Sequence, residues 1–172
     1  MSDLDRALVN LSGYVGLFEA LFYAICFVCG AAMVLIGLFR MTQRANMAAN
    51  ATWRGAVATI LAGSTIVAFP ALVGVLNSTL WGAPEVATSD QIFSYAPTLL
   101  DPVDGHAARV VEAIVLLVQF FGLIAVFRGI LLLNEHVQAG TPSRLGAGLT
   151  FIIAGAVAIN LPRFAGLLDE LV

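Results

Sequence analysis

Four long apolar runs, separated by shorter polar stretches, dominate the pattern of hydrophobic and polar positions along the chain. They cover roughly Tyr14–Phe39, Ala56–Leu80, Val110–Leu133 and Leu145–Leu168. Each run approaches or exceeds the ~20 apolar residues that cross a hydrocarbon core of about 30 Å. Because backbone groups inside lipid must be hydrogen-bonded within their own segment, we expect helices rather than strands. The pattern therefore predicts an all-α polytopic membrane protein with four transmembrane helices.

The second half of the chain repeats the first half at an offset of 92 residues. Each copy holds two apolar runs joined by a polar stretch, which predicts two tandem, parallel helical hairpins. We therefore expect a single membrane domain over 1–172, with hairpin repeat one at 14–81 and hairpin repeat two at 109–172. The matching positions are small or helix-breaking residues in one ungapped register: Gly30 and Gly122, Gly37 and Gly129, Ala62-Gly63 and Ala154-Gly155, Pro70 and Pro162, Gly74 and Gly166.

Two segments lie outside the repeats. Residues 1–13 place Leu4, Leu8 and Leu11 on one helical face, which fits either a short helix at the membrane interface or a frayed terminus. Residues 82–108 form an acidic loop with several prolines, far longer than a tight turn between helices. This loop is either a spacer between two like-oriented hairpins or a contact with neighbouring subunits.

Composition and charge agree with a membrane protein. Hydrophobic residues make up 60% of the chain, charged residues 11%, and the mean hydropathy is +0.95. These values lie outside the range of soluble globular domains, so the lipid bilayer takes the place of a water-facing surface. The net charge is −3 and lysine is absent. Without a cluster of cations we expect no direct binding of nucleic acid.

Arginines near the helix ends predict the orientation of the chain. The short polar loops 40–54 and 134–144 carry or adjoin five arginines, whereas the other side holds three. The positive-inside rule then places these two loops in the cytoplasm and both termini on the opposite side.

The sequence offers little catalytic or metal-binding chemistry. Cys26 and Cys29 form a C-x-x-C spacing inside an apolar run, without further ligands nearby. Small buried apolar residues explain this pair better than a metal site or a redox pair. His106 and His136 lie at opposite helix ends, and no nucleophile triad, phosphate loop or carboxylate pair occurs at a useful spacing. We therefore predict that the protein is not an enzyme and holds neither a cofactor nor a metal.

Ionisable groups within or beside the apolar runs are costly in lipid and are candidates for function. Glu19, Arg109, Glu112, Arg128 and Arg163 all fall near helix ends. We interpret them as interfacial anchors and interhelix pairs. The functional alternative is a proton-coupled carboxylate at Glu19.

The repeated small residues predict close helix packing. Helices in lipid associate through close backbone approach at glycine and alanine, because no hydrophobic force acts between them. Pro70 and Pro162 fall late in the second helix of each hairpin, where a kink or break is expected. The predicted packing and assembly positions are Gly30, Gly37, Gly63, Gly74, Gly122, Gly129, Gly155 and Gly166.

Several stretches resemble the IcmC/DotE family and its TraQ-like relatives. They are the run from Gln119 to Gly129 and the segments Gly146–Thr150 and Ala154–Asn160. In the first half they are the run from Cys29-Gly30 to Gly37-Leu38-Phe39 and the end of the second apolar run, Ala68-Phe69-Pro70. The family comprises small polytopic inner-membrane components of type IVB secretion and conjugation machines, so the resemblance implies a bacterial inner-membrane location. The lysine-containing inner loop of the family is here Thr42–Arg54, without lysine.

Two functions of different class follow. The favoured one is a non-enzymatic structural subunit of a type IVB secretion or conjugation apparatus. It would form a homo-oligomer with other apparatus subunits, around the transfer conduit or within a pilus-like filament. The alternative is a small four-helix proton-coupled transporter that uses Glu19.

Overall fold

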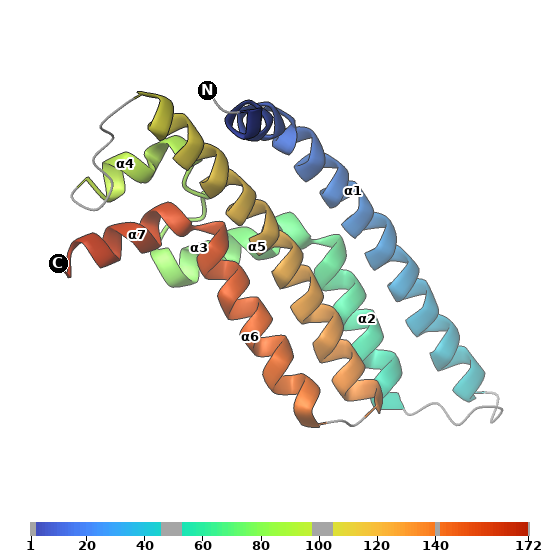
Figure 1. Ribbon diagram of the computed structural model, residues 1–172. Coiled ribbons are helices and arrows are strands. Elements are labelled where there is room, and N and C mark those ends of the chain that lie inside the picture. Colours follow the sequence, from blue (N-terminus) through green and yellow to red (C-terminus); the bar gives the residue numbers. More distant parts are fainter. Residues whose placement is uncertain (1–2, 46–52, 98–104, 140–141, 172) are drawn as a thin grey trace. The chain divides into compact units, whose positions relative to one another are not determined.

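The computed structural model describes residues 3–45, 53–97, 105–139 and 142–171, and all regular elements within them are helical. Residues 46–52 of the predicted loop 40–54, residues 98–104 of the predicted 82–108 loop, and residues 140–141 lie outside the described part, as do the side chains of residues 3–12. The elements are α1 (Asp3–Ala45), α2 (Trp53–Val67), α3 (Phe69–Trp81), the 3-10 turn η1 (Ser89–Gln91), α4 (Ile92–Tyr95), α5 (Gly105–Ala139), α6 (Pro142–Ile159) and α7 (Leu161–Asp169) (Figure 1).

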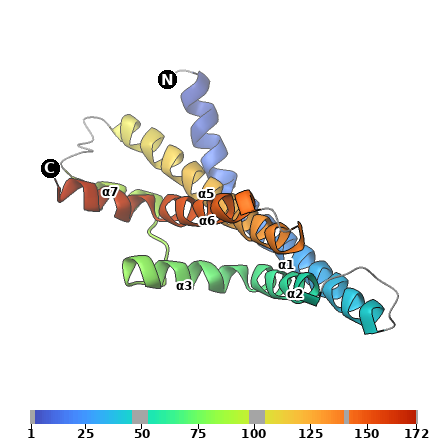
Figure 2. The same ribbon diagram turned by 90° about the horizontal axis from the view of Figure 1, so that it is seen from below.

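Within the described residues, two helical segments are long and apolar enough to cross a membrane, which indicates a membrane-embedded protein. They are Gly13–Gln43 of α1 and Ala107–Ala139 of α5. The second and fourth apolar runs are each bent sharply, in the region where Pro70 and Pro162 predict a kink or break. α2 and α3 meet at 83°, and α6 and α7 meet at 79°. In Figure 2, α3 and α7 are seen from the side while α2 and α6 are foreshortened. The described part of the chain therefore contains two apolar spans, or up to four if each bent pair counts as one.

Both bends fall two residues before a proline. The first helix of each pair ends at Val67 or Ile159, and the proline is Pro70 or Pro162, the second residue of the next helix. Proline lacks a backbone N–H and disfavours helical geometry at the residue before it. At the second break Asn160 has φ −114° and ψ 40°, outside the helical region. The chain therefore begins a new helix after each break instead of continuing the old one.

The helices extend beyond the predicted apolar runs. α1 begins at Asp3, so the predicted segment 1–13 is helical from that residue and continuous with the first run. α1 also reaches Ala45 and α5 reaches Ala139, so much of the two predicted loops is helical. Arg144 forms an ion pair with Glu135 across the second of these turns.

Two compact units make up the chain, and both repeats contribute to each. The hairpin unit consists of Leu21–Val73 and Ala125–Ala154. The loop unit consists of Met1–Ala20, Gly74–Ile124 and Gly155–Val172. Each unit is described by itself below.

In the hairpin unit, α1 packs against α2 with backbone touching backbone. A β-carbon added to Gly30 would lie 2.7 Å from the Gly63 carbonyl oxygen and 2.7 Å from the Val67 amide nitrogen. One at Gly37 would lie 2.5 Å from the Ile60 side chain. No side chain larger than hydrogen fits at these positions unless the helices separate.

Repeat two makes the same contacts 92 residues later. A β-carbon on Gly129, the counterpart of Gly37, would lie 2.6 Å from the Ile152 side chain, again within the hairpin unit. A β-carbon on Gly122, in the loop unit, would lie 2.8 Å from the Gly155 carbonyl oxygen and 2.8 Å from the Ile159 amide nitrogen. The residues nearest to these glycines in repeat two lie 92 positions after those nearest in repeat one.

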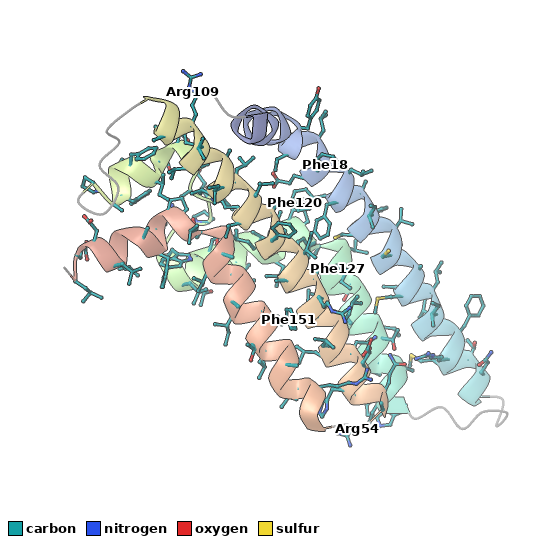
Figure 3. All side chains as sticks on the ribbon, viewed as in Figure 1. Phe18, Arg54, Arg109, Phe120, Phe127 and Phe151 are labelled. Carbon is teal, nitrogen blue, oxygen red and sulfur yellow. The ribbon has the colours of Figure 1, made fainter. Side chains whose placement is uncertain are left out.

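The two hairpins also touch each other inside the hairpin unit. The rings of Phe22, Phe69 and Phe127 form an edge-on cluster with centroids 5.7 to 6.4 Å apart, and Phe127 is labelled on α5 in Figure 3. Arg40 donates hydrogen bonds to Gln138 Oε1 at 2.6 Å and to Thr59 Oγ1 at 3.4 Å. α1 therefore contacts α5 at two separate levels, together with α3 at the aromatic cluster and α2 at Arg40.

We expect Gly122→Ala to destabilise the folded protein by about 1 to 3 kcal/mol, because the new methyl group must push α5 away from the backbone of α6. Gly146→Ala is the matched control, since a β-carbon there meets nothing within 4 Å and alanine favours the helix. Unfolding of both variants in a mixed-micelle denaturation series measures the difference. Equal stability of the two variants would show that the close approach is not needed.

Candidate functional site

The described part of the loop between the repeats packs against its own chain. α4 lies on α7, and a β-carbon on Gly166 would come within 3.0 Å of the Tyr95 carbonyl oxygen. Ala87, Ile92 and Ala96 are buried, with at most 4% of their surface exposed. These three residues therefore belong to the core of the loop unit, whereas most of the other residues in 82–97 are exposed.

Two amide side chains hold this loop at the helix break. Asn160, at the break itself, accepts a hydrogen bond from the Ala87 amide nitrogen at 2.9 Å. Gln119 of α5 donates to the Ala87 carbonyl oxygen at 2.7 Å and to the Ile159 carbonyl oxygen at 3.0 Å. Ile159 ends α6, so its carbonyl has lost its helical partner. The two amides thus form hydrogen bonds with the last carbonyl of α6 and with both the N–H and the C=O group of Ala87.

The corresponding positions of repeat one cannot form this site. Phe27 stands in the register of Gln119, and Ala68 stands in the register of Asn160. Neither side chain can donate or accept a hydrogen bond. The two repeats share their helix packing but differ at the break, which explains why the loop folds onto the break of repeat two.

Further polar atoms are buried in the loop unit. Asn77 of α3 is fully buried, and both of its side-chain polar atoms lack a hydrogen-bond partner in the described part of the chain. Three further nitrogen atoms are buried without a hydrogen-bond partner in the described part of the chain: Trp81 Nε1, Asn160 Nδ2 and Arg163 Nη1. A buried donor without an acceptor costs roughly 1 to 3 kcal/mol, so these groups call for partners that the described residues do not supply.

A cavity of about 360 Å³ opens beside two of these donors. Arg163 reaches it from the first turn of α7, and Glu170 from the residue that caps α7 at its other end. The aromatic side chains come from the end of α3 and from α4. The residues lining the cavity are Trp81, Ala83, Tyr95, Arg163, Gly166, Leu167 and Glu170.

The predicted interfacial charges are spread over several helices. Arg109 is exposed at the start of α5, where Figure 3 shows it directed away from the helix, and Glu112 is half-buried one turn later. Glu19 is half-buried in α1, and Arg128 is exposed on α5. Arg163 is the member of the set that lines the cavity.

The predicted glycine positions also separate into two groups. Gly30, Gly37, Gly63, Gly122 and Gly129 face backbone or side chains of a neighbouring helix of the same chain, and Gly155 receives Gly122. Gly166 instead supports Tyr95, and a β-carbon on Gly74 would meet only Pro84 at an ordinary 3.8 Å. None of the first group is available on the surface for contacts with other subunits.

The C-x-x-C pair is divided between two surroundings. Cys26 is buried and Cys29 is exposed. Among the residues that the structure describes, no group of three or more His, Cys, Asp or Glu side chains could hold a metal ion.

Sequence reasoning did not single out Gln119, Asn160, Asn77 or Trp81. A signal was present for the first three, because an amide within an apolar run has to find a partner in lipid. Comparing the repeats position by position would have strengthened this signal for Gln119 and Asn160, whose counterparts Phe27 and Ala68 carry no polar group.

Comparison of the chain with protein-family models, with curated proteins and with solved structures gives no match. The resemblance to IcmC/DotE proteins therefore stays a prediction that depends on the residues quoted for it.

We expect Asn160→Ala and Gln119→Leu to release the loop from the break, since each removes hydrogen bonds to Ala87 worth about 1 kcal/mol apiece. Amide hydrogen exchange of a peptide covering residues 83–97 should accelerate by roughly five- to tenfold. Gln138→Ala, which removes an amide that accepts from Arg40, is the control and should leave that peptide unchanged. Unchanged exchange in both site variants would rule out these amides as the anchor.

Proposed function

We propose that the chain is a non-enzymatic structural membrane subunit of a type IVB secretion or conjugation apparatus and acts by oligomeric assembly. It would stand with other apparatus subunits in the bacterial inner membrane, around the transfer conduit or within a pilus-like filament. The residues that resemble IcmC/DotE proteins motivate the choice of apparatus. The observation that carries the assembly mechanism is the free face of α1.

That face presents an apolar stripe with coiled-coil spacing. Leu21, Val28 and Leu35 are seven residues apart, and between 56% and 66% of each side chain is exposed. Ile25, Ala32 and Phe39 fall between and after them and are also exposed. Spacings that alternate between three and four residues allow two helices to interlock along one seam.

The opposite face of α1 forms the contacts within the chain. Gly30 and Gly37 face α2, as described above, so the close packing inside each chain is separate from the stripe. Assembly then would not disturb the hairpins. A second copy of the chain, meeting the stripe through its own α1, would form a symmetric contact.

We further propose that each bent pair forms one crossing, so that four crossings place both termini on the same side. α2 has 15 residues and α6 has 18. At 1.5 Å per residue these helices are about 22 and 27 Å long, short of the roughly 30 Å hydrocarbon core. The bent helices α3 and α7 would complete the crossing near the far interface. The arginines near the two short turns favour the cytoplasm for those turns and the periplasm for the termini.

A small proton-coupled transporter is the second candidate function. Broken helices with buried polar residues at the break are typical of transporter sites, and the break at Asn160 has this character. Glu19, the predicted proton carrier, is half-buried in α1 of the loop unit.

We expect a cysteine at Leu35 to cross-link copies of the chain in native membranes, in a background where Cys26 and Cys29 are replaced by alanine. Ile153→Cys is the matched control, because Ile153 is equally exposed, at 62%, but lies on α6. Cross-linking that is no stronger at Leu35 than at Ile153 would remove the support for assembly through α1.

The paired change Val28→Trp with Leu35→Trp should lower plasmid or effector transfer at least tenfold while leaving the unfolding of the purified chain unaltered, because it adds bulk to the seam only. Normal transfer by this variant would contradict the proposed function.

For the second candidate, Glu19→Gln should abolish proton-coupled flux in vesicles if the chain is a transporter. On the structural proposal no such flux exists, and the variant transfers DNA or effector like the parent. Proton flux that depends on Glu19 would replace the first proposal with the second.

A further inference from the structure

We propose that the cavity beside α7 binds a phospholipid head group that carries both a phosphate and a primary ammonium group, as in phosphatidylethanolamine. The proposal stands on the cavity and its side chains and does not depend on the secretion or transport functions. Its volume of about 360 Å³ falls within the range of sites for small molecules.

The phosphate would occupy the end of the cavity near the start of α7. Arg163 and Trp81 both line the cavity, and Arg163 Nη1 and Trp81 Nε1 are buried without an acceptor in the described residues. Both atoms are fully buried, so each side chain would rotate to offer its donor to a phosphate in the cavity. Hydrogen bonds from a guanidinium to a phosphate oxygen are among the strongest in proteins. Arg163 is the third residue of α7, whose N-terminal dipole also favours an anion.

The ammonium group would occupy the other end. Glu170 lines the cavity and caps the C-terminus of α7. Its carboxylate and the negative end of the helix dipole both favour a cation. A simple anion would be repelled there, whereas a zwitterion can align its two charges with those of α7. This charge arrangement selects the ammonium-containing head group over an anionic one.

A lipid fits the surroundings better than a free phosphoester. Leu167 lines the cavity with 51% of its side chain exposed, and Leu168 and Leu171 are exposed at 43% and 82%. These side chains offer an apolar surface for acyl chains next to the head group. Trp81 and Tyr95 are residue types that concentrate at the level of head groups in membranes.

Native mass spectrometry of the purified chain in mixed micelles provides the test, with phosphatidylethanolamine and phosphatidylglycerol of matched acyl chains offered together. We expect one tightly retained phosphatidylethanolamine per chain. Arg163→Gln should lower its retention about tenfold, and Trp81→Phe, which keeps the ring, should lower it several-fold. Arg109→Gln is the control for loss of one positive charge in the same unit, because Arg109 is exposed and remote from the cavity lining.

The variant Glu170→Gln should change which of the two lipids the chain prefers, an effect that loss of the fold would not produce. Removing the carboxylate should weaken the binding of phosphatidylethanolamine and strengthen the binding of phosphatidylglycerol, because an anionic head group no longer meets a negative charge. Equal retention of both lipids by the parent chain, or no change of preference in Glu170→Gln, would overturn the proposal.

Free phosphoethanolamine distinguishes the source of the head group. Titration calorimetry should give binding at least a hundredfold weaker than that of the lipid, because the apolar contacts are missing. Free phosphoethanolamine that binds as tightly as the lipid would show that the site takes a soluble phosphoester, and would overturn the lipid assignment.

Discussion

A helix that ends inside an apolar environment must satisfy the backbone groups that its end exposes, and this constraint shapes the loop unit. Ile159 and Asn160 are buried at the break, so each backbone group left there without a partner would cost roughly 1 to 3 kcal/mol. Gln119 meets the constraint at the break after Ile159 by binding the last carbonyl of α6 and the loop residue Ala87. Asn160 completes the arrangement from the break itself. The hydrogen bonds that satisfy the end of α6 therefore also join the loop to α5 and to the break.

The repeats show how a duplicated hairpin can acquire different ends without losing its packing. The glycine contacts in the two copies match in partner and in distance, because any side chain at Gly30 or Gly122 would separate the helices. The ends were free to diverge. Repeat one has the apolar residues Phe27 and Ala68 at these positions. Repeat two has Gln119 and Asn160 there, and their amides form hydrogen bonds with the loop. Only one of the two breaks can therefore receive the segment that joins the repeats.

The features that the sequence predicted well are those set by local chemistry. Apolar runs gave the helices, the glycine register indicated where helices approach closely, and Pro70 and Pro162 marked the region of the bends. The size of the bends could not be predicted, because proline disfavours straight continuation without fixing the new direction. The loop fold escaped prediction for another reason. Burial of Ala87, Ile92 and Ala96 depends on amides that are distant in the sequence, and no local pattern in residues 82–97 encodes those partners.

The candidate site was harder still, since its groups come from α3, α4 and α7 and meet only in the folded chain. Arg163 was predicted as an interfacial anchor, and the structure shows that it lines the cavity. Glu170 at the far end of α7 carries the opposite charge. A helix of nine residues with an arginine at one end and a glutamate at the other is itself a dipole aligned with its backbone. Such a helix can orient a zwitterion, whereas a lone arginine at a membrane surface would attract any anion.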